Sequence, residues 1–158
     1  MSPRDARVAA QLQEMRRDWD AVRTHAERAA RTDPSSGAAE AAYVALSLDH
    51  AFQAFETMLL RVERALGLPE RSGAAWHASL LADASGDLPR VRPVVFPPAV
   101  LRDWEGLLRF RHFLRHAYTL DLEAERLIEN AARLTRAVAA SDATVRALFE
   151  ALEATLAR

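Results

Sequence analysis

Apolar side chains recur at helical spacing along most of this chain, and this pattern restricts the fold more than any other feature of the sequence. Charged residues fill the positions between them, as on amphipathic helices. In the first long segment, about residues 4–31, the apolar series is Leu12, Met15, Trp19, Val22 and Ala26, and in the second, about 38–66, it is Leu46, Phe52, Phe55, Leu59, Val62 and Leu66. Because the 158 residues include only 5 glycines and are 50% hydrophobic, we expect an all-α protein with a single domain over residues 1–158.

Clusters of proline and glycine divide the helical pattern. Residues 33–37 are a clear break, and Gly67 is suited to end the second helix, with Pro69 following it. Residues 86–98 contain four prolines and two arginines. They cannot form a regular helix, so we expect an extended loop over the surface.

The remaining segments predict three further helices. These are a short one at about 73–84, a fourth from near Pro98 to about Tyr118, and a last one at about 122–157. Asp121 is placed to cap the last helix, and Ser141-Asp142 can bend or restart it. Together the segments predict an antiparallel bundle of five to six helices.

The composition excludes several classes of site. The chain has no cysteine, so disulfides, thiolate catalysis and cysteine zinc sites are excluded. No apolar run approaches the roughly 18 residues of a membrane span, and the polar N-terminus lacks the apolar core of a signal peptide, so we expect a cytoplasmic protein. The net charge of −1 does not by itself indicate nucleic-acid binding, although all 21 basic residues are arginines, which can grip phosphate through two N–H groups.

Two arginines, two histidines and a tyrosine fall within about two turns of the predicted fourth helix. At about 100° per residue, Arg111, Arg115 and Tyr118 lie within about 60° of one another, and His112 and His116 lie beside them. An apolar arc, from about 200° to 320° when Arg111 is set at zero, is expected to face the core. We therefore expect the whole polar set to face outward, where it would line a groove or meet a partner.

These side chains are the ones that metal-free cleavage of RNA requires. The RNA 2′-hydroxyl is the nucleophile, and an enzyme must remove its proton, protonate the leaving 5′-oxygen and stabilise the charge around phosphorus. Histidine, with an unperturbed pKa of about 6.5, can transfer the protons, and arginine can stabilise the charge. One helix offers Arg111 and His116 for these tasks, and a two-fold dimer would double the set in one cleft.

The same residues also fit plainer roles. Arginines and histidines on an exposed helical face are usually only solvated, and Tyr118 fits a core or interface position. His112 and His116 have the spacing of metal ligands on a helix. No acidic residue lies between them and no third ligand is evident, so we expect no metal site.

Three short patterns, in this order, resemble the HepT-like toxins of the HEPN superfamily. They are W-H-x-x-L-L at residues 76–81, R-P-x-V at 92–95 and R-x4-H-x-Y at 111–118, and the likeness runs from about Tyr43 to about Leu134. The resemblance implies a helical bundle that dimerises through the motif helix. It also implies a metal-independent endoribonuclease toxin, for which we expect no cofactor.

The resemblance further implies roles for individual residues. Arg111 and His116 would be the catalytic pair, with His112 and Arg115 as RNA-binding or supporting residues. A cognate antitoxin of minimal nucleotidyltransferase fold would neutralise the toxin by transferring AMP to Tyr118. The residue after the motif arginine is often Asn or Asp in the superfamily, and His112 departs from that pattern, which leaves the acid and base roles of the two histidines open. The alternatives are a non-catalytic HEPN-like helical module that binds a nucleotide or a partner protein, and a plain interaction bundle.

Other polar residues carry weaker indications. His77 is expected to pack or cap the short helix, with support of a neighbouring site residue or contact to RNA as the alternative. His25 and His50 lie in long helices without a neighbouring motif and are expected to be structural. Arg90 and Arg92 are expected to be flexible surface charges, with a grip on RNA or antitoxin as the alternative.

Overall fold

The computed structural model describes residues 2–116 and 122–157, which form five α-helices and one short 3₁₀ turn. In chain order these are α1 (Pro3–Arg31), α2 (Ala38–Ala65), α3 (Trp76–Ala84), η1 (Pro98–Val100), α4 (Leu101–His116) and α5 (Ala124–Leu156). The prediction of an all-α bundle is confirmed. Within these two ranges, no helix is long and apolar enough to cross a bilayer.

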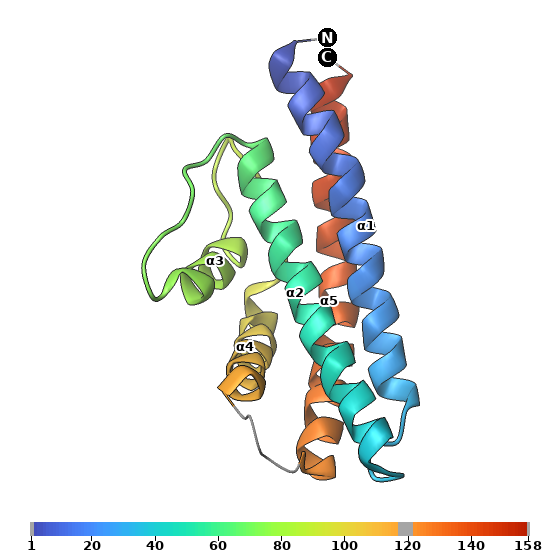
Figure 1. The fold of residues 1–158 in the computed structure, drawn as a ribbon. Coiled ribbons are helices and arrows are strands. Elements are labelled where there is room, and N and C mark those ends of the chain that lie inside the picture. The colour runs from blue at the N-terminus through green and yellow to red at the C-terminus, as the bar shows by residue number, and fades with distance from the viewer. Residues whose placement is uncertain (1, 117–121, 158) are drawn as a thin grey trace.

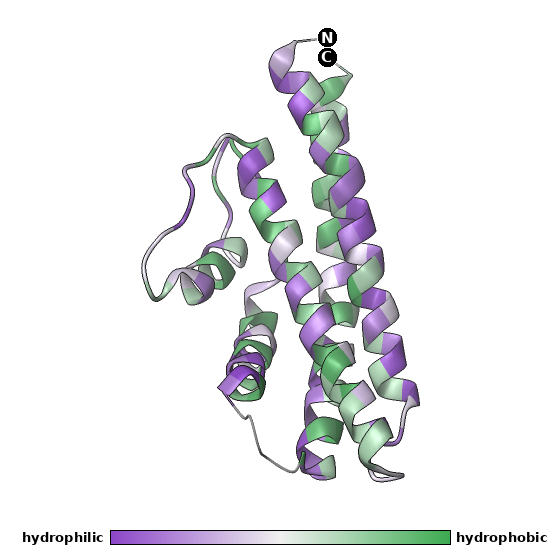
Figure 2. Cartoon of the chain, viewed as in Figure 1, coloured by the Kyte–Doolittle hydropathy of each residue, from purple (hydrophilic) through white to green (hydrophobic). Residues whose placement is uncertain are grey.

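The three long helices α1, α2 and α5 pack together, and the shorter α3 and α4 lie along one flank of α2 (Figure 1). Hydrophilic and hydrophobic residues alternate along the long helices, as the amphipathic pattern of the sequence predicts (Figure 2). Helix α4 contacts α2, α3 and α5. The helix that carries the R-x4-H motif is therefore packed against three others.

The helix ends follow the predicted breaks closely. Gly67 ends α2 with a φ of +71°, in the left-handed region that suits glycine. Helix α3 begins at Trp76, later than the predicted start at 73, because Gly73 has a φ of +94° and cannot belong to a helix. Asp121, the predicted cap of α5, lies outside the described residues.

Aromatic side chains fill the core where α2, α4 and α5 meet. The rings of Phe55 and Trp104 stack with their centres 3.6 Å apart. The indole N–H of Trp104 donates to the Ser141 hydroxyl at 3.2 Å, and that of Trp19 donates to the Asp142 carboxylate at 2.8 Å. The prediction that Ser141-Asp142 bends or restarts the last helix is wrong, because both side chains accept indole protons while the helix continues through them.

The proline-rich segment between α3 and η1 is anchored by Arg92. An isolated antiparallel bridge closes a turn here, and Arg90 at its tip has a φ of +66°. The Arg92 guanidinium donates to the carbonyls of Asp83, Gly86 and Pro93 at 2.8–3.0 Å, and Arg92 is only 6% exposed. The expectation of a flexible surface charge is therefore wrong for Arg92, because the end of α3 and the turn both need donors for their free carbonyls.

Candidate active site

Arg111 of α4 is buried against α2, with 6% of its surface exposed. Its Nε donates to Oδ1 of Asp49 at 3.2 Å, and its Nη1 donates to Oε1 of Glu56 at 3.1 Å. Its Cζ lies 5.5 Å from the centre of the Phe52 ring. The expectation that Arg111 faces outward is wrong, and two carboxylates supply the opposite charge that allows an arginine to be buried.

The position of Trp104 explains why Arg111 points inward. Trp104 precedes Arg111 by seven residues, which places the two side chains within about 20° of each other around α4. Trp104 is fully buried, so the core-facing side of α4 is wider than the apolar residues between 107 and 117 suggest. A helical wheel that begins one turn earlier would have found this signal.

Asp49 and Glu56 are the site residues that the sequence analysis missed. Together with Phe52 they follow the three- and four-residue spacing that puts side chains on one face of a helix. Glu56 lies four residues after Phe52 and three before Leu59, both of which are buried. An acidic residue in the middle of an apolar stripe was therefore the available signal, because such a residue needs a buried cation.

Glu56 also binds His77 of α3. Oε2 of Glu56 lies 2.5 Å from Nδ1 of His77, while Oε1 accepts from Arg111. The imidazole stacks on the Trp76 indole with ring centres 3.6 Å apart. Glu56 is 8% exposed and the His77 side chain 35% exposed. His77 thus packs on Trp76, and the Glu56 carboxylate joins it to Arg111.

The rest of the motif lies on the open side of α4. His112, Arg115 and His116 are exposed, and the rings of the two histidines lie 4.2 Å apart between centres. Among the described residues, no hydrogen bond or ion pair links these three side chains to Arg111. Tyr118 lies outside the described residues. Within residues 2–116 and 122–157, no group of three or more histidines and carboxylates could hold a metal ion.

Helix α5 steadies this open end of α4. The guanidinium carbon of Arg126 lies 3.8 Å from the centre of the Phe113 ring and 5.9 Å from that of Phe110. Cations at such distances are attracted to the ring face. The last turns of α4 are thus fixed against α5 although their polar side chains face solvent.

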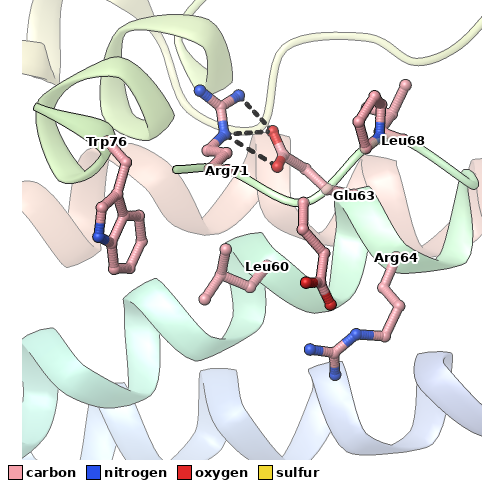
Figure 3. Close-up of a pocket in the computed structure, with 8 residues that line it drawn as sticks. Leu60, Glu63, Arg64, Leu68, Arg71 and Trp76 are labelled. Carbon is pink, nitrogen blue, oxygen red and sulfur yellow. Dashed lines mark hydrogen bonds and ion pairs between the residues drawn. The ribbon is translucent and has the colours of Figure 1, made fainter. Parts of the chain in front are cut away.

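A hollow of about 220 Å³ borders Trp76, between the end of α2 and the start of α3. Figure 3 shows Arg71 paired with Glu63 on one side of it and Trp76 on the other. The hydrogen bond to Glu63 raises the pKa of Arg71, and Asp83 adds to the effect. This ion pair fixes the loop that leads into α3, and so it fixes the start of the helix that carries His77.

Comparison with known proteins places these residues in a family. No curated protein and no solved structure matches the chain. A family model described as "HepT-like protein" matches residues 43–152, which include Asp49, Glu56, His77, Arg111 and His116. The match spans well over half of the 158 residues and agrees with the resemblance of the sequence patterns. The chain belongs to the HepT-like family.

Proposed function

We propose that this protein is a metal-independent endoribonuclease toxin of a HEPN/minimal-nucleotidyltransferase toxin–antitoxin system. The observation that carries the proposal is the fixed position of Arg111, the first residue of the R-x4-H motif, in a chain of the HepT-like family. A donor that is already oriented costs no reorganisation when charge develops in the transition state. An arginine that serves only solubility would not need two buried or half-buried carboxylates to hold it.

Arg111 keeps donors for a substrate. A guanidinium has five N–H groups, and the two carboxylates take one from Nε and one from Nη1. We assign Arg111 to the non-bridging oxygens of the scissile phosphate, where negative charge accumulates. His116 is the proton-transfer partner at the open end of the same helix, and His112 and Arg115 support RNA binding there.

The active groove is proposed to require two copies of the chain. His116 is five positions after Arg111, so the directions of the two side chains differ by about 140° around α4. One copy therefore turns its arginine inward and its histidine outward. A two-fold dimer through the exposed side of α4 would bring the histidines of both copies into one groove. Sedimentation at micromolar protein should give a dimer, and an active strict monomer would contradict the shared groove.

The carboxylates nearest to Arg111 are already paired with it, which supports RNA cleavage without a metal ion. Asp49 and Glu56 are the acidic side chains that contact Arg111, and both are engaged by its guanidinium. A divalent ion there would have to displace that cation. RNA cleavage should therefore persist in excess chelator and should leave a 2′,3′-cyclic phosphate.

Substitution of the histidines tests the proposal directly. His116→Ala should reduce the cleavage rate by about 10²–10⁴-fold, the usual contribution of a proton-transfer group. His112→Ala is the matched variant on the same exposed surface and should have a smaller effect. Equal losses in both variants would mean that the two histidines share the proton transfers. Full activity in His116→Ala, or loss of activity with chelator, would contradict the mechanism.

Tyr118 is proposed as the site that an antitoxin of nucleotidyltransferase fold modifies with AMP. It follows Arg111 by seven residues in the sequence, and the added phosphate would compete with RNA for the arginines. Co-expression with such a partner should add the mass of AMP to the wild type and not to Tyr118→Phe. Retained modification in that variant would exclude Tyr118 as the acceptor.

A non-catalytic module that binds a nucleotide or a partner protein is the second candidate. The charge of Arg111 is already balanced by carboxylates, and this observation favours a structural role for the arginine. A wild-type dimer that binds RNA or nucleotide without cleaving RNA would establish this alternative.

A further inference from the structure

We propose that His77 is the general base of this site, and that Glu56 orients it. The inference rests on the proposed ribonuclease function and adds to it a third histidine, from α3, outside the R-x4-H motif. Sequence patterns alone favour a packing role for His77. Its contacts with Glu56 and Trp76 favour a catalytic one.

Glu56 fixes the tautomer of His77. One carboxylate oxygen of Glu56 accepts from the Nη1 of Arg111 at 3.1 Å. The other oxygen lies 2.5 Å from Nδ1 of His77. An ionised carboxylate only accepts, so Nδ1 must donate its proton to it. In the neutral ring the lone pair is then on Nε2, which is the arrangement of a base held by a carboxylate.

The imidazole is both fixed and accessible. The Trp76 indole stacks on it at 3.6 Å between ring centres, which restricts the tilt of the ring. The His77 side chain is 35% exposed, although its Nδ1 lies against the buried carboxylate of Glu56. Trp76, on which the imidazole stacks, also lines the hollow of Figure 3.

The charges around His77 suit a residue that takes up a proton. Asp49 and Glu56 face the cluster from α2, and Arg111 faces it from α4. With a neutral His77 the formal charge of these four side chains is −1. Proton uptake by the imidazole makes the cluster neutral, as the carboxylate of a catalytic triad stabilises its imidazolium.

The chemical step is a transesterification within the RNA. Nε2 of His77 takes the proton of the 2′-hydroxyl, and the 2′-oxygen forms a bond to phosphorus. The bond from phosphorus to the 5′-oxygen breaks, and that oxygen receives a proton from His116, which acts as the acid and later regains a proton from water. The products are a 2′,3′-cyclic phosphate and a 5′-hydroxyl, and His77 returns its proton to water. Arg111, held through the same carboxylate as His77, meets the charge that develops on the non-bridging oxygens.

The variant His77→Asn distinguishes a general base from a residue that only holds Glu56 in place. The Asn amide can replace Nδ1 as a donor to Glu56, but it has no nitrogen that exchanges a proton near neutral pH. Cleavage by His77→Asn should be about 10²–10⁴-fold slower than by wild type, and its pH–rate profile should lose the acidic limb. His25→Asn, on α1 and outside the site, is the matched control and should cleave at the wild-type rate.

The alternative outcomes are distinct. An active wild type together with a His77→Asn variant of near wild-type rate would mean that His77 only braces Glu56, and it would overturn this inference alone. A wild type that cleaves no RNA would overturn both this inference and the proposed function.

A second measurement does not depend on activity. Nitrogen-15 spectra of the wild-type imidazoles should place the proton of neutral His77 on Nδ1, and Glu56→Gln should move it to Nε2 if the amide oxygen stays with Arg111. A wild-type ring that carries its proton on Nε2 would overturn the inference, whatever the cleavage assay gives.

Discussion

Arg111 and Arg92 are equally buried, at 6% exposed each, but they are held in opposite ways. Arg111 binds two carboxylates on another helix. Arg92 binds three backbone carbonyls within ten residues of itself, and burial lowers its pKa. At Arg92 the guanidinium donates to neutral carbonyls and so fixes a turn. At Arg111 the carboxylates accept hydrogen bonds too, but they also balance the positive charge and connect the arginine to other titratable groups. Burial alone therefore does not distinguish the two arginines, but the chemistry of their partners does.

The largest expected effect is on catalysis at Arg111. Arg111→Lys keeps the positive charge that Asp49 and Glu56 require, but it loses the planar set of donors. The cleavage rate should fall by about 10²–10³-fold, as when one transition-state donor is removed. Circular dichroism should show an intact fold. Arg109→Lys is the exposed control on the same helix, and equal rates for the two lysine variants would mean that Arg111 has no special role.

Replacement of Arg111 by alanine should also lower the stability of the fold, unlike replacement by lysine. Arg111→Ala leaves the buried Glu56 without its cation, which typically costs about 3–5 kcal/mol. Loss of activity in that variant would thus be mixed with loss of stability, and this is why the lysine variant is the sharper test.

Substitution of Arg92 should lower the free energy of unfolding and leave the rate of RNA cleavage unchanged. Arg92→Met removes the donors from three carbonyls, and we expect a loss of about 2–4 kcal/mol, because each unpaired buried group costs about 1–3 kcal/mol and water can reach part of the turn. The corresponding fall in Tm is about 5–15 °C. Arg90→Met, in the same turn but exposed, should leave Tm nearly unchanged. The comparison between the two arginines would fail if Arg92→Met kept its Tm and lost cleavage.

Asp49 is the weaker of the two acidic partners of Arg111. Its side chain is 27% exposed and its bond to Nε is 3.2 Å long. The amide oxygen of Asp49→Asn can still accept from Nε, so urea unfolding should show a loss of no more than about 1 kcal/mol. The cleavage rate should change only a few-fold. A loss as large as in Arg111→Lys would show that the charge of Asp49, and not only that of Glu56, is essential.

The smallest effect concerns acid stability far from the site. Burial lowers the pKa of His25 below its ordinary value of 6.5, and the neighbouring His50 adds to the effect. Because the unfolded chain then binds the proton more readily, the stabilisation is complete above pH 6.5 and is lost as the pH falls through the lowered pKa. Thermal unfolding between pH 7 and pH 5 should be less pH-dependent in His25→Asn. If the change in Tm between pH 7 and pH 5 is the same in His25→Asn as in the wild type, other groups cause the loss of stability in acid.

Most of the fold could be predicted because its signals are local. Helical periodicity identified the helices within a few residues, and proline and glycine identified the breaks. The exceptions depend on residues far apart in the sequence. Ser141 and Asp142 look like helix breakers until two indole N–H groups, 37 and 123 residues away, are found to use them as acceptors.

The site could be predicted only in part for the same reason. The R-x4-H spacing singled out Arg111 and His116 as candidates, but no local pattern gives the orientation of Arg111. That orientation is set by Trp104 on the same helix and by carboxylates 55 and 62 residues away. His77 enters the cluster from a third helix, and only the packing of α3 against α2 reveals it.

The stack of Trp76 on His77 has an optical consequence. A protonated imidazole in contact with an indole quenches its fluorescence, whereas a neutral one does so much less. Trp19 and Trp104 are buried and hydrogen-bonded in the core, so they give a nearly constant background. The emission of Trp76 should therefore follow the charge of His77 as the pH is varied or as RNA binds, and the protein would report the state of this histidine without any added label.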